Sequence, residues 1–161
     1  IVDGAKTRRA VGKVMTYILD PSNNKKSIAA LVKSWTGKDI EDFSVNPHDR
    51  RIPVDERVVP PLEEWLSAFA DADFVVTDSF HGCVLSLIFH KPFIAVGNGQ
   101  RGMARMRSLL EMFGLDQRLV HGIDPEDDGE FFLSQPDWIA VDAVLAEHRA
   151  AARRFLADAL K

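Results

Sequence analysis

The stretch "DFVVTDSFHGCVLSLIFHKPFIAVG", residues 73 to 97, contains two short apolar runs on either side of a longer one. The first run, 73–77, is β-branched and does not alternate with polar residues, which is typical of a central parallel strand covered on both faces. Residues 82–89 are apolar almost all round and predict a buried helix. Residues 92–97 predict the next strand. The stretch therefore predicts a strand, a helix and a second strand in succession.

The same alternation extends toward the N-terminus. Residues 13–19, "KVMTYIL", predict a buried strand that ends in a turn at Asp20-Pro21. The apolar spacing that follows predicts an amphipathic helix stopped by Gly37, and 40–46 is a weaker strand candidate. After a charged, proline-rich loop, Pro60 and Pro61 open a second helix. The apolar positions of these two helices are Ile28, Leu31, Val32 and Trp35, and Leu62, Trp65, Leu66 and Phe69.

Toward the C-terminus the pattern predicts a helix over 104–114 and a short last strand over 118–120. An acidic loop, "DPEDDGE", then precedes a long final helix. One face of that helix is expected to carry Val141, Val144, Leu145, His148, Ala152, Phe155, Leu156 and Ala159. The predicted fold is α/β, a Rossmann-like parallel sheet with helices on both faces, formed by residues 1–161 as a single domain.

Composition narrows the possible classes of protein. The chain has 161 residues, 46% of them hydrophobic, without an apolar run long enough to cross a bilayer, so we expect a soluble, cytoplasmic protein. The net charge is −4 and basic residues are scattered, which argues against a nucleic-acid partner. A lone cysteine, Cys83, excludes an internal disulfide and is expected in the core. The start lacks Met and a signal sequence, so Ile1 is interpreted as a trimmed edge.

Polar residues stand where the strand over 73–77 gives way to a helix. Ligands of such sheets bind beyond the carboxyl ends of the strands, where the helix N-termini point. Asp78 or Ser79 can cap the helix, and the remaining N–H groups form an anion site. His81 stands in the first turn and suits a general acid when an anionic substrate arrives. Gly82 leaves room for a ligand to approach the backbone.

A second candidate site follows the next strand, in "GNGQRGMARMRSLL" (97–110). If the segment is helical by Arg101, then Arg101 and Arg105 share a face, and such guanidinium groups bind phosphate or carboxylate oxygens bidentately. The sequence contains neither a GxGxxG fingerprint nor a Walker loop, and no compact set of metal ligands, so no metal is expected. The alternatives remain that Asp78 and Ser79 only cap, that His81 is a surface residue, and that the arginines form a solvated basic face.

Several of these segments together resemble one family. "YILD", "EEWLSAFADADFVVTDSFHGCVLSLIFHKPFIAV", "NGQRGMARMRSLLEMFGLDQRL" and "RRFLADAL" are similar, in order, to the C-terminal half of polysaccharide pyruvyl transferases. The resemblance implies the C-terminal domain of a two-domain GT-B fold, with the N-terminal domain absent from this chain. The departures from the family pattern are Cys83, where Thr or Ser is more usual, and Met106, in a place often held by an aromatic residue.

The resemblance also implies a bacterial enzyme that transfers pyruvate from phosphoenolpyruvate to a sugar diol as a cyclic ketal, in exopolysaccharide or cell-wall polymer synthesis. His81 is then catalytic. Substrate-binding roles fall to Asp78, Ser79, Gly82, Asn98, Arg101 and Arg105. Phosphoenolpyruvate is the donor substrate, no cofactor is needed, and the saccharide acceptor is free or lipid-linked, the latter at the inner face of the membrane. This chain alone is expected to be inactive, since half of its cleft is missing.

Two other functions stay open at this stage. A GT-B glycosyltransferase that uses nucleotide sugars would have a similar half-domain but would bind a nucleoside diphosphate in preference to phosphoenolpyruvate. A non-catalytic saccharide-binding module would carry a degenerate site. A direct function is less expected for the other histidines. His48 lies in a predicted loop, His90 lies at a predicted helix C-terminus, and His121 and His148 have no polar cluster near them in the sequence. The loop over 47–59 either borders the cleft or is a solvated connector.

Overall fold

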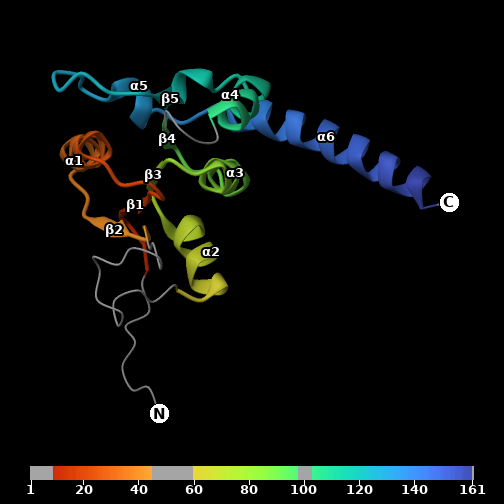
Figure 1. Ribbon diagram of the computed structural model, residues 1–161, viewed down its shortest axis with the longest axis horizontal. Helices are drawn as coiled ribbons and strands as arrows, with labels where there is room; N and C mark the ends of the chain where they lie inside the picture. The colour runs from red at the N-terminus through yellow and green to blue at the C-terminus, as the bar shows by residue number, and fades with distance from the viewer. Residues whose placement is uncertain (1–8, 45–59, 98–102, 161) are drawn as a thin grey trace, which may run out of the picture.

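The computed structural model describes residues 9–44, 60–97 and 103–160, and these form a five-stranded, fully parallel sheet (Figure 1). The order of strands across the sheet is β2-β1-β3-β4-β5. The α/β class and the Rossmann-like sheet predicted from the sequence are confirmed. The bounds are β1 Val14–Tyr17, β2 Ile40–Asp42, β3 Phe74–Thr77, β4 Phe93–Val96 and β5 Leu119–Val120.

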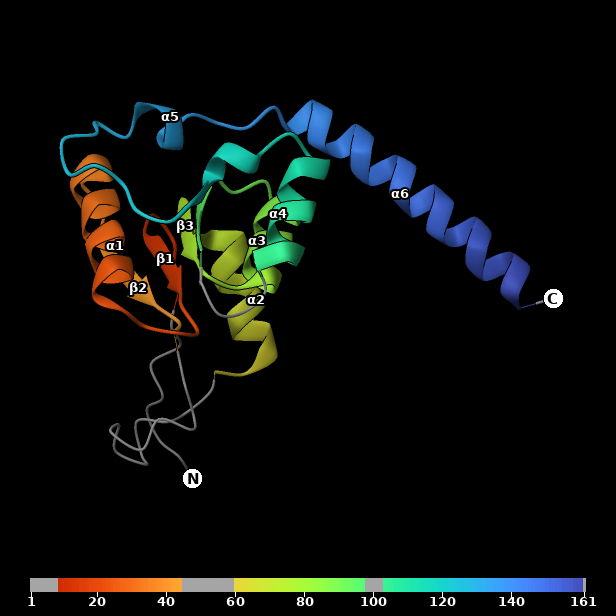
Figure 2. The same cartoon turned by 45° about the horizontal axis from the view of Figure 1, so that its top comes forward.

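Helices cover both faces of the sheet (Figure 2). The helix α1 packs on one face with the short α5, whereas α2, α3 and α4 pack on the other. Their bounds are α1 Asn23–Thr36, α2 Leu62–Asp71, α3 Phe80–Ile88, α4 Met103–Met112, α5 Glu130–Leu133 and α6 Trp138–Ala159, with a 3₁₀ turn at Asp116–Arg118 before β5. Ser22 caps α1 and Gly37, in the left-handed region at φ 64°, ends it as predicted.

Two apolar cores result from the alternation of side chains along the strands. Beside α1, Val76 and Ile94 pack with Ile28 and Val32. On the opposite face, Val75, Phe93 and Ala95 pack with residues of the three other helices, among them Phe69, Cys83, Leu87, Met106 and Leu110. All residues of β3 and β4 are buried, as the lack of alternation in the sequence predicts.

The helix α3 is less buried than its sequence suggests. Gly82, Cys83, Ser86 and Leu87 are buried, but Ile88 is 44% exposed. The reason is position, because α3 lies in the outer layer and only one of its faces meets the sheet. An apolar sequence on all sides therefore does not mean burial on all sides.

Arg118 connects the last part of the chain to the sheet. Its guanidinium is buried and donates to the carbonyl oxygens of Phe93 (3.2 Å), Phe132 (2.9 Å) and Ser134 (2.6 Å). Burial lowers the pKa of Arg118 to about 10, so the group stays charged at neutral pH. The contacts fix α5 and the segment after it against β4.

The final helix, α6, extends away from the sheet (Figure 1). Val141 is its one buried residue, and every position from 146 to 160 is exposed. The predicted apolar face therefore packs on the described body only in its first turns, around Val141 and Leu145. Beyond them, Phe155 is 72% exposed.

Candidate active site

The N-terminus of α3 lies at the carboxyl end of β3. Ser79 occupies the N-cap position with extended backbone, but no side chain makes a capping hydrogen bond there. The prediction that Asp78 or Ser79 caps this helix is therefore wrong. The Ser79 N–H itself donates to the Thr77 hydroxyl at 3.1 Å. No capping side chain in the described residues accepts a hydrogen bond from the first-turn N–H groups of α3. These groups therefore remain directed at the sheet edge.

Asp78 is turned toward the β1 side of the edge. One carboxylate oxygen accepts from the Leu19 N–H at 2.6 Å, and the other accepts from the Asp20 N–H at 3.0 Å. The second oxygen also forms an ion pair with Lys25 of α1 at 2.7 Å, where the Asp78 side chain has no exposed surface. The carboxylate holds the loop after β1 beside the start of α3, which explains its failure to cap.

Gly82 is buried against β3. A Cβ atom built on it would lie 2.2 Å from the Thr77 hydroxyl oxygen. That hydroxyl donates to the Tyr17 carbonyl at 2.7 Å, so it is held in place. The absence of a side chain at Gly82 thus lets α3 pack closely on β3, with Thr77 in the space between them. That space is not open to a ligand, so the expectation that Gly82 leaves room for one is wrong.

His81 and Arg105 both lie near one aromatic ring, that of Phe80. The ring centres of His81 and Phe80 are 5.8 Å apart in an edge-to-face arrangement, and the Arg105 guanidinium carbon lies 5.5 Å from the Phe80 ring centre. Both polar side chains are exposed, while Phe80 is half-buried. The structure therefore brings together a histidine of α3 and an arginine of the first turn of α4, at the N-termini of two neighbouring helices.

A shallow hollow of about 370 Å³ runs beside Arg105 between α3 and α4. It is lined by Phe80, Ala104, Arg105, Ser108, Leu109 and Met112. The other two residues of the predicted basic site, Asn98 and Arg101, lie outside the described residues, as do His48 and the loop over 47–59. Of the arginines that the structure describes in α4, Arg105 is the one that lies against Phe80.

A second histidine, His121, for which a direct function is less expected from the sequence, also lies at this edge. His121 directly follows β5, and a Cβ atom on Gly97, the residue after β4, would lie 2.7 Å from its imidazole and 3.2 Å from the Met103 sulfur. Its carbonyl oxygen accepts from the Asn24 side chain at 2.7 Å. The signal was present in the sequence, since a residue that follows a predicted parallel strand belongs to the ligand-binding edge.

The remaining candidates have structural surroundings. Burial, with a contribution from the Asp78 carboxylate, raises the pKa of the Cys83 thiol to about 12, as suits a core cysteine. His90 forms a hydrogen bond with Asp142 at 2.9 Å and stacks on Trp138, which joins the turn after α3 to α6. His148 is exposed on α6. Within the described ranges, no three His, Cys, Asp or Glu side chains are grouped so as to hold a metal ion.

The fold is that of a Rossmann-like α/β protein, and one edge of its sheet carries the N-termini of α3 and α4 with His81 and Arg105 near Phe80. A family model for polysaccharide pyruvyl transferases matches residues 7–100, more than half of the chain. The chain therefore belongs to the polysaccharide pyruvyl transferase family, a family of transferases. The match includes Asp78 to Gly82 and ends before Arg101 and Arg105.

No curated protein and no solved structure matched the chain. None of the helices in the described parts of the chain combines the length and the apolar character that a bilayer span requires.

Proposed function

We propose that this chain forms the donor-binding half of an enzyme that transfers pyruvate from phosphoenolpyruvate to a sugar diol, as a cyclic ketal. The enzyme would serve exopolysaccharide or cell-wall polymer synthesis in the cytoplasm, and an N-terminal domain would complete the cleft. The observation that carries the proposal is that His81 and Arg105 both lie near the Phe80 ring, beside the N-terminus of α3, which has no side-chain cap.

The donor suits such a site because it carries both a phosphate and a carboxylate. The N–H groups of α3 and its dipole favour one anionic group, and Arg105 favours the other. Arg101 and Asn98 are proposed to add further contacts. The described part of the site therefore offers positive groups on two elements that meet at one edge.

The reaction requires a proton on the methylene carbon of the donor and departure of phosphate. His81 delivers the first proton or assists the leaving group, and Arg105 stabilises charge near the oxocarbenium-like carbon. One sugar hydroxyl attacks that carbon, the bond to phosphate oxygen breaks, and a second hydroxyl closes the ketal. The two hydroxyl protons balance the one gained by the new methyl group and the one carried by phosphate.

The test uses the full-length protein with phosphoenolpyruvate and a saccharide acceptor. The His81→Ala variant should lose turnover by roughly 10²–10⁴-fold, measured by phosphate release and by the methyl signal of the ketal in NMR spectra. The His148→Ala variant is the matched control, because its histidine is exposed on α6. Near-normal turnover of His81→Ala would refute the assignment.

Binding of the donor is a separate measurement. Arg105→Gln should weaken phosphoenolpyruvate about 10-fold or more, as expected for a lost charge-assisted hydrogen bond. Arg107→Gln, on the same helix and exposed, should not. A parallel titration with UDP identifies a nucleotide-sugar enzyme instead if UDP binds and phosphoenolpyruvate does not.

A further inference from the structure

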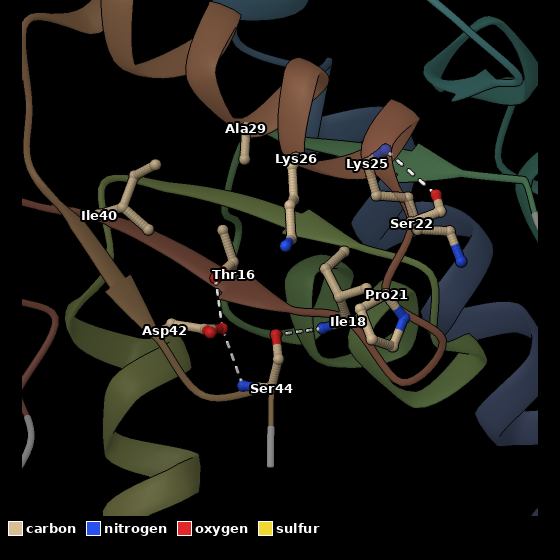
Figure 3. A pocket seen from close by; sticks show the side chains of 10 residues that line it. All are labelled: Thr16, Ile18, Pro21, Ser22, Lys25, Lys26, Ala29, Ile40, Asp42 and Ser44. Atoms are coloured by element: carbon tan, nitrogen blue, oxygen red, sulfur yellow. Dashed lines mark hydrogen bonds between the residues drawn. The ribbon is translucent and has the colours of Figure 1, made fainter. Parts of the chain in front are cut away.

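A pocket lies on the α1 side of the sheet, at the carboxyl ends of β1 and β2 (Figure 3). Its volume is about 250 Å³, slightly below the roughly 300–1,000 Å³ of pockets for drug-sized ligands. It is lined by Thr16, Ile18, Pro21, Ser22, Lys25, Lys26, Ala29, Ile40, Asp42 and Ser44. None of these residues belongs to the proposed donor site, so the pocket needs an explanation of its own.

One end of the pocket is positively charged. Lys26, in the first turns of α1, extends toward the strands and into the pocket (Figure 3). The start of α1 carries two lysines and no acidic residue, an unfavourable arrangement at the positive end of a helix dipole. Lys25 is compensated by Asp78 at 2.7 Å. Lys26 takes no part in that ion pair, so an anion at this end would be favoured by both its ammonium and the dipole.

The opposite end of the pocket is built from hydrogen-bond acceptors. Asp42, the last residue of β2, accepts from the Thr16 hydroxyl at 2.6 Å and from the Ser44 N–H at 2.9 Å. The Ser44 hydroxyl oxygen accepts from the Ile18 N–H at 2.8 Å. These bonds fix the carboxylate and the hydroxyl in place. A carboxylate repels anions and accepts from hydroxyl groups, so this end suits a ligand part with O–H donors.

The walls between the two ends are aliphatic. Ile18, Pro21, Ala29 and Ile40 present apolar surface on both sides of the pocket. A ligand that matches the whole pocket therefore has an anion at one end, hydroxyl groups at the other, and a compact ring with apolar C–H surface between them. A sugar ring that carries a phosphate has all three features.

We propose that this pocket binds a glycosyl phosphate unit, with the phosphate at Lys26 and the ring hydroxyls at Asp42 and Ser44. As an acceptor site it rests on the proposed function, and the Lys25–Asp78 ion pair places it beside the start of α3, where the donor is proposed to bind. The binding itself does not depend on that function.

The test is calorimetric titration of the full-length protein with glucose 1-phosphate, with glucose and inorganic phosphate as separate arms. Glucose 1-phosphate should saturate and bind more tightly than either part. Ala29→Leu, which fills the pocket, should weaken it at least 10-fold, while Ala30→Leu, exposed on the same helix, should leave it unchanged. Lys26→Met should weaken both glucose 1-phosphate and phosphate, and Lys33→Met, outside the pocket, should weaken neither.

The proposal is overturned if glucose 1-phosphate does not saturate, or if Ala29→Leu binds it as the wild type does. A further arm with UDP-glucose identifies the source of the unit: tighter binding than glucose 1-phosphate indicates a nucleotide-linked sugar, and equal binding indicates the glycosyl phosphate alone. Binding of phosphoenolpyruvate tests the donor site independently. Normal binding of phosphoenolpyruvate with no sugar phosphate binding refutes the pocket alone, whereas the reverse result refutes the donor assignment and keeps the pocket.

Discussion

At the scale of single residues, Gly82 shows how the motif beside His81 depends on packing. The Thr77 side chain occupies the space where a larger residue at position 82 would place its Cβ atom. Thr77 cannot rotate freely, because its hydroxyl joins the Tyr17 carbonyl to the Ser79 N–H. The glycine thus sets the distance between α3 and β3, and with it the position of the helix N-terminus.

Gly82→Ala should therefore destabilise the fold by roughly 1–3 kcal/mol through overpacking, as measured by urea unfolding. Gly122→Ala is the control, because the nearest atom to a Cβ at that position is 3.8 Å away. The two variants add the same methyl group. Equal unfolding free energies for them would contradict the packing role of Gly82.

Cys83 predicts a dependence of stability on pH. Its folded pKa is about 12, whereas an unfolded thiol titrates near about 8.5. Between these values unfolding releases a proton, so the contribution of Cys83 falls as pH rises, by at most about 1.4 kcal/mol per pH unit. Below the unfolded pKa the contribution is complete.

The measurement compares the wild type with Cys83→Ala in urea unfolding at pH 8 and pH 10.5. The difference in unfolding free energy between the two proteins should shrink at the higher pH, because only the wild type has this thiol to ionise. A difference that stays constant over this range would show that the folded thiol titrates at its ordinary pKa.

At the scale of elements, one ion pair fixes two connections of the sheet. Asp78 receives the N–H groups of Leu19 and Asp20 together with the Lys25 ammonium. The start of α1 and the start of α3 are therefore held at a fixed spacing by groups buried from water. Burial of an ion pair is tolerated here because each carboxylate oxygen also has a backbone donor.

Loss of one partner leaves the other buried and unpaired. Asp78→Ala should cost about 3–5 kcal/mol of unfolding free energy. Lys25→Met should cost less, because the carboxylate keeps its two backbone donors. Thermal and urea unfolding of both variants measure this order. If Lys25→Met lost more unfolding free energy than Asp78→Ala, the main stabilising contact would instead be the hydrogen bond from Lys25 to the Asp20 carbonyl, at 2.6 Å.

The elements were largely predictable from the sequence, and their long-range contacts were not. The lack of alternation in 73–77 and 92–97 located β3 and β4, and Gly37 located the end of α1. Sequence spacing holds no information on which donors a carboxylate will meet, so Asp78 was interpreted as a cap, although its partners lie 53 to 59 residues away. The short α5 was missed because four residues are too few for a periodic signal.

The candidate site was predictable to the same extent. The rule that ligands bind at the carboxyl ends of parallel strands placed His81 and Arg105 at one edge, and both lie beside Phe80. His121 was given a weaker functional interpretation because its neighbours Gly97 and Asn24 come from the end of β4 and from α1, far away in the sequence. The pocket beside α1 likewise needs residues from β1, β2 and α1, which only the folded sheet brings together.

At the scale of the whole molecule, α6 differs from the other helices in the described residues. Its first turns contact the rest of the described fold in two ways. Val141 is buried in the core, and Asp142 and Trp138 contact His90. From residue 146 onward it is exposed, with Phe155 and Leu156 among the exposed apolar side chains. Its two halves therefore depend on different interactions for their stability.

This division predicts the rate at which amide hydrogens exchange with deuterium along α6. Helices of fewer than roughly 12–15 residues are only marginally stable alone in water, so amides after residue 146 should exchange orders of magnitude faster than the amide of Val141. Mass spectrometry of peptides from the two halves measures the contrast in this chain. If the proposed N-terminal domain is added, the same peptides act as a footprint: slow exchange beyond residue 146 then marks the turns of α6 that another surface covers.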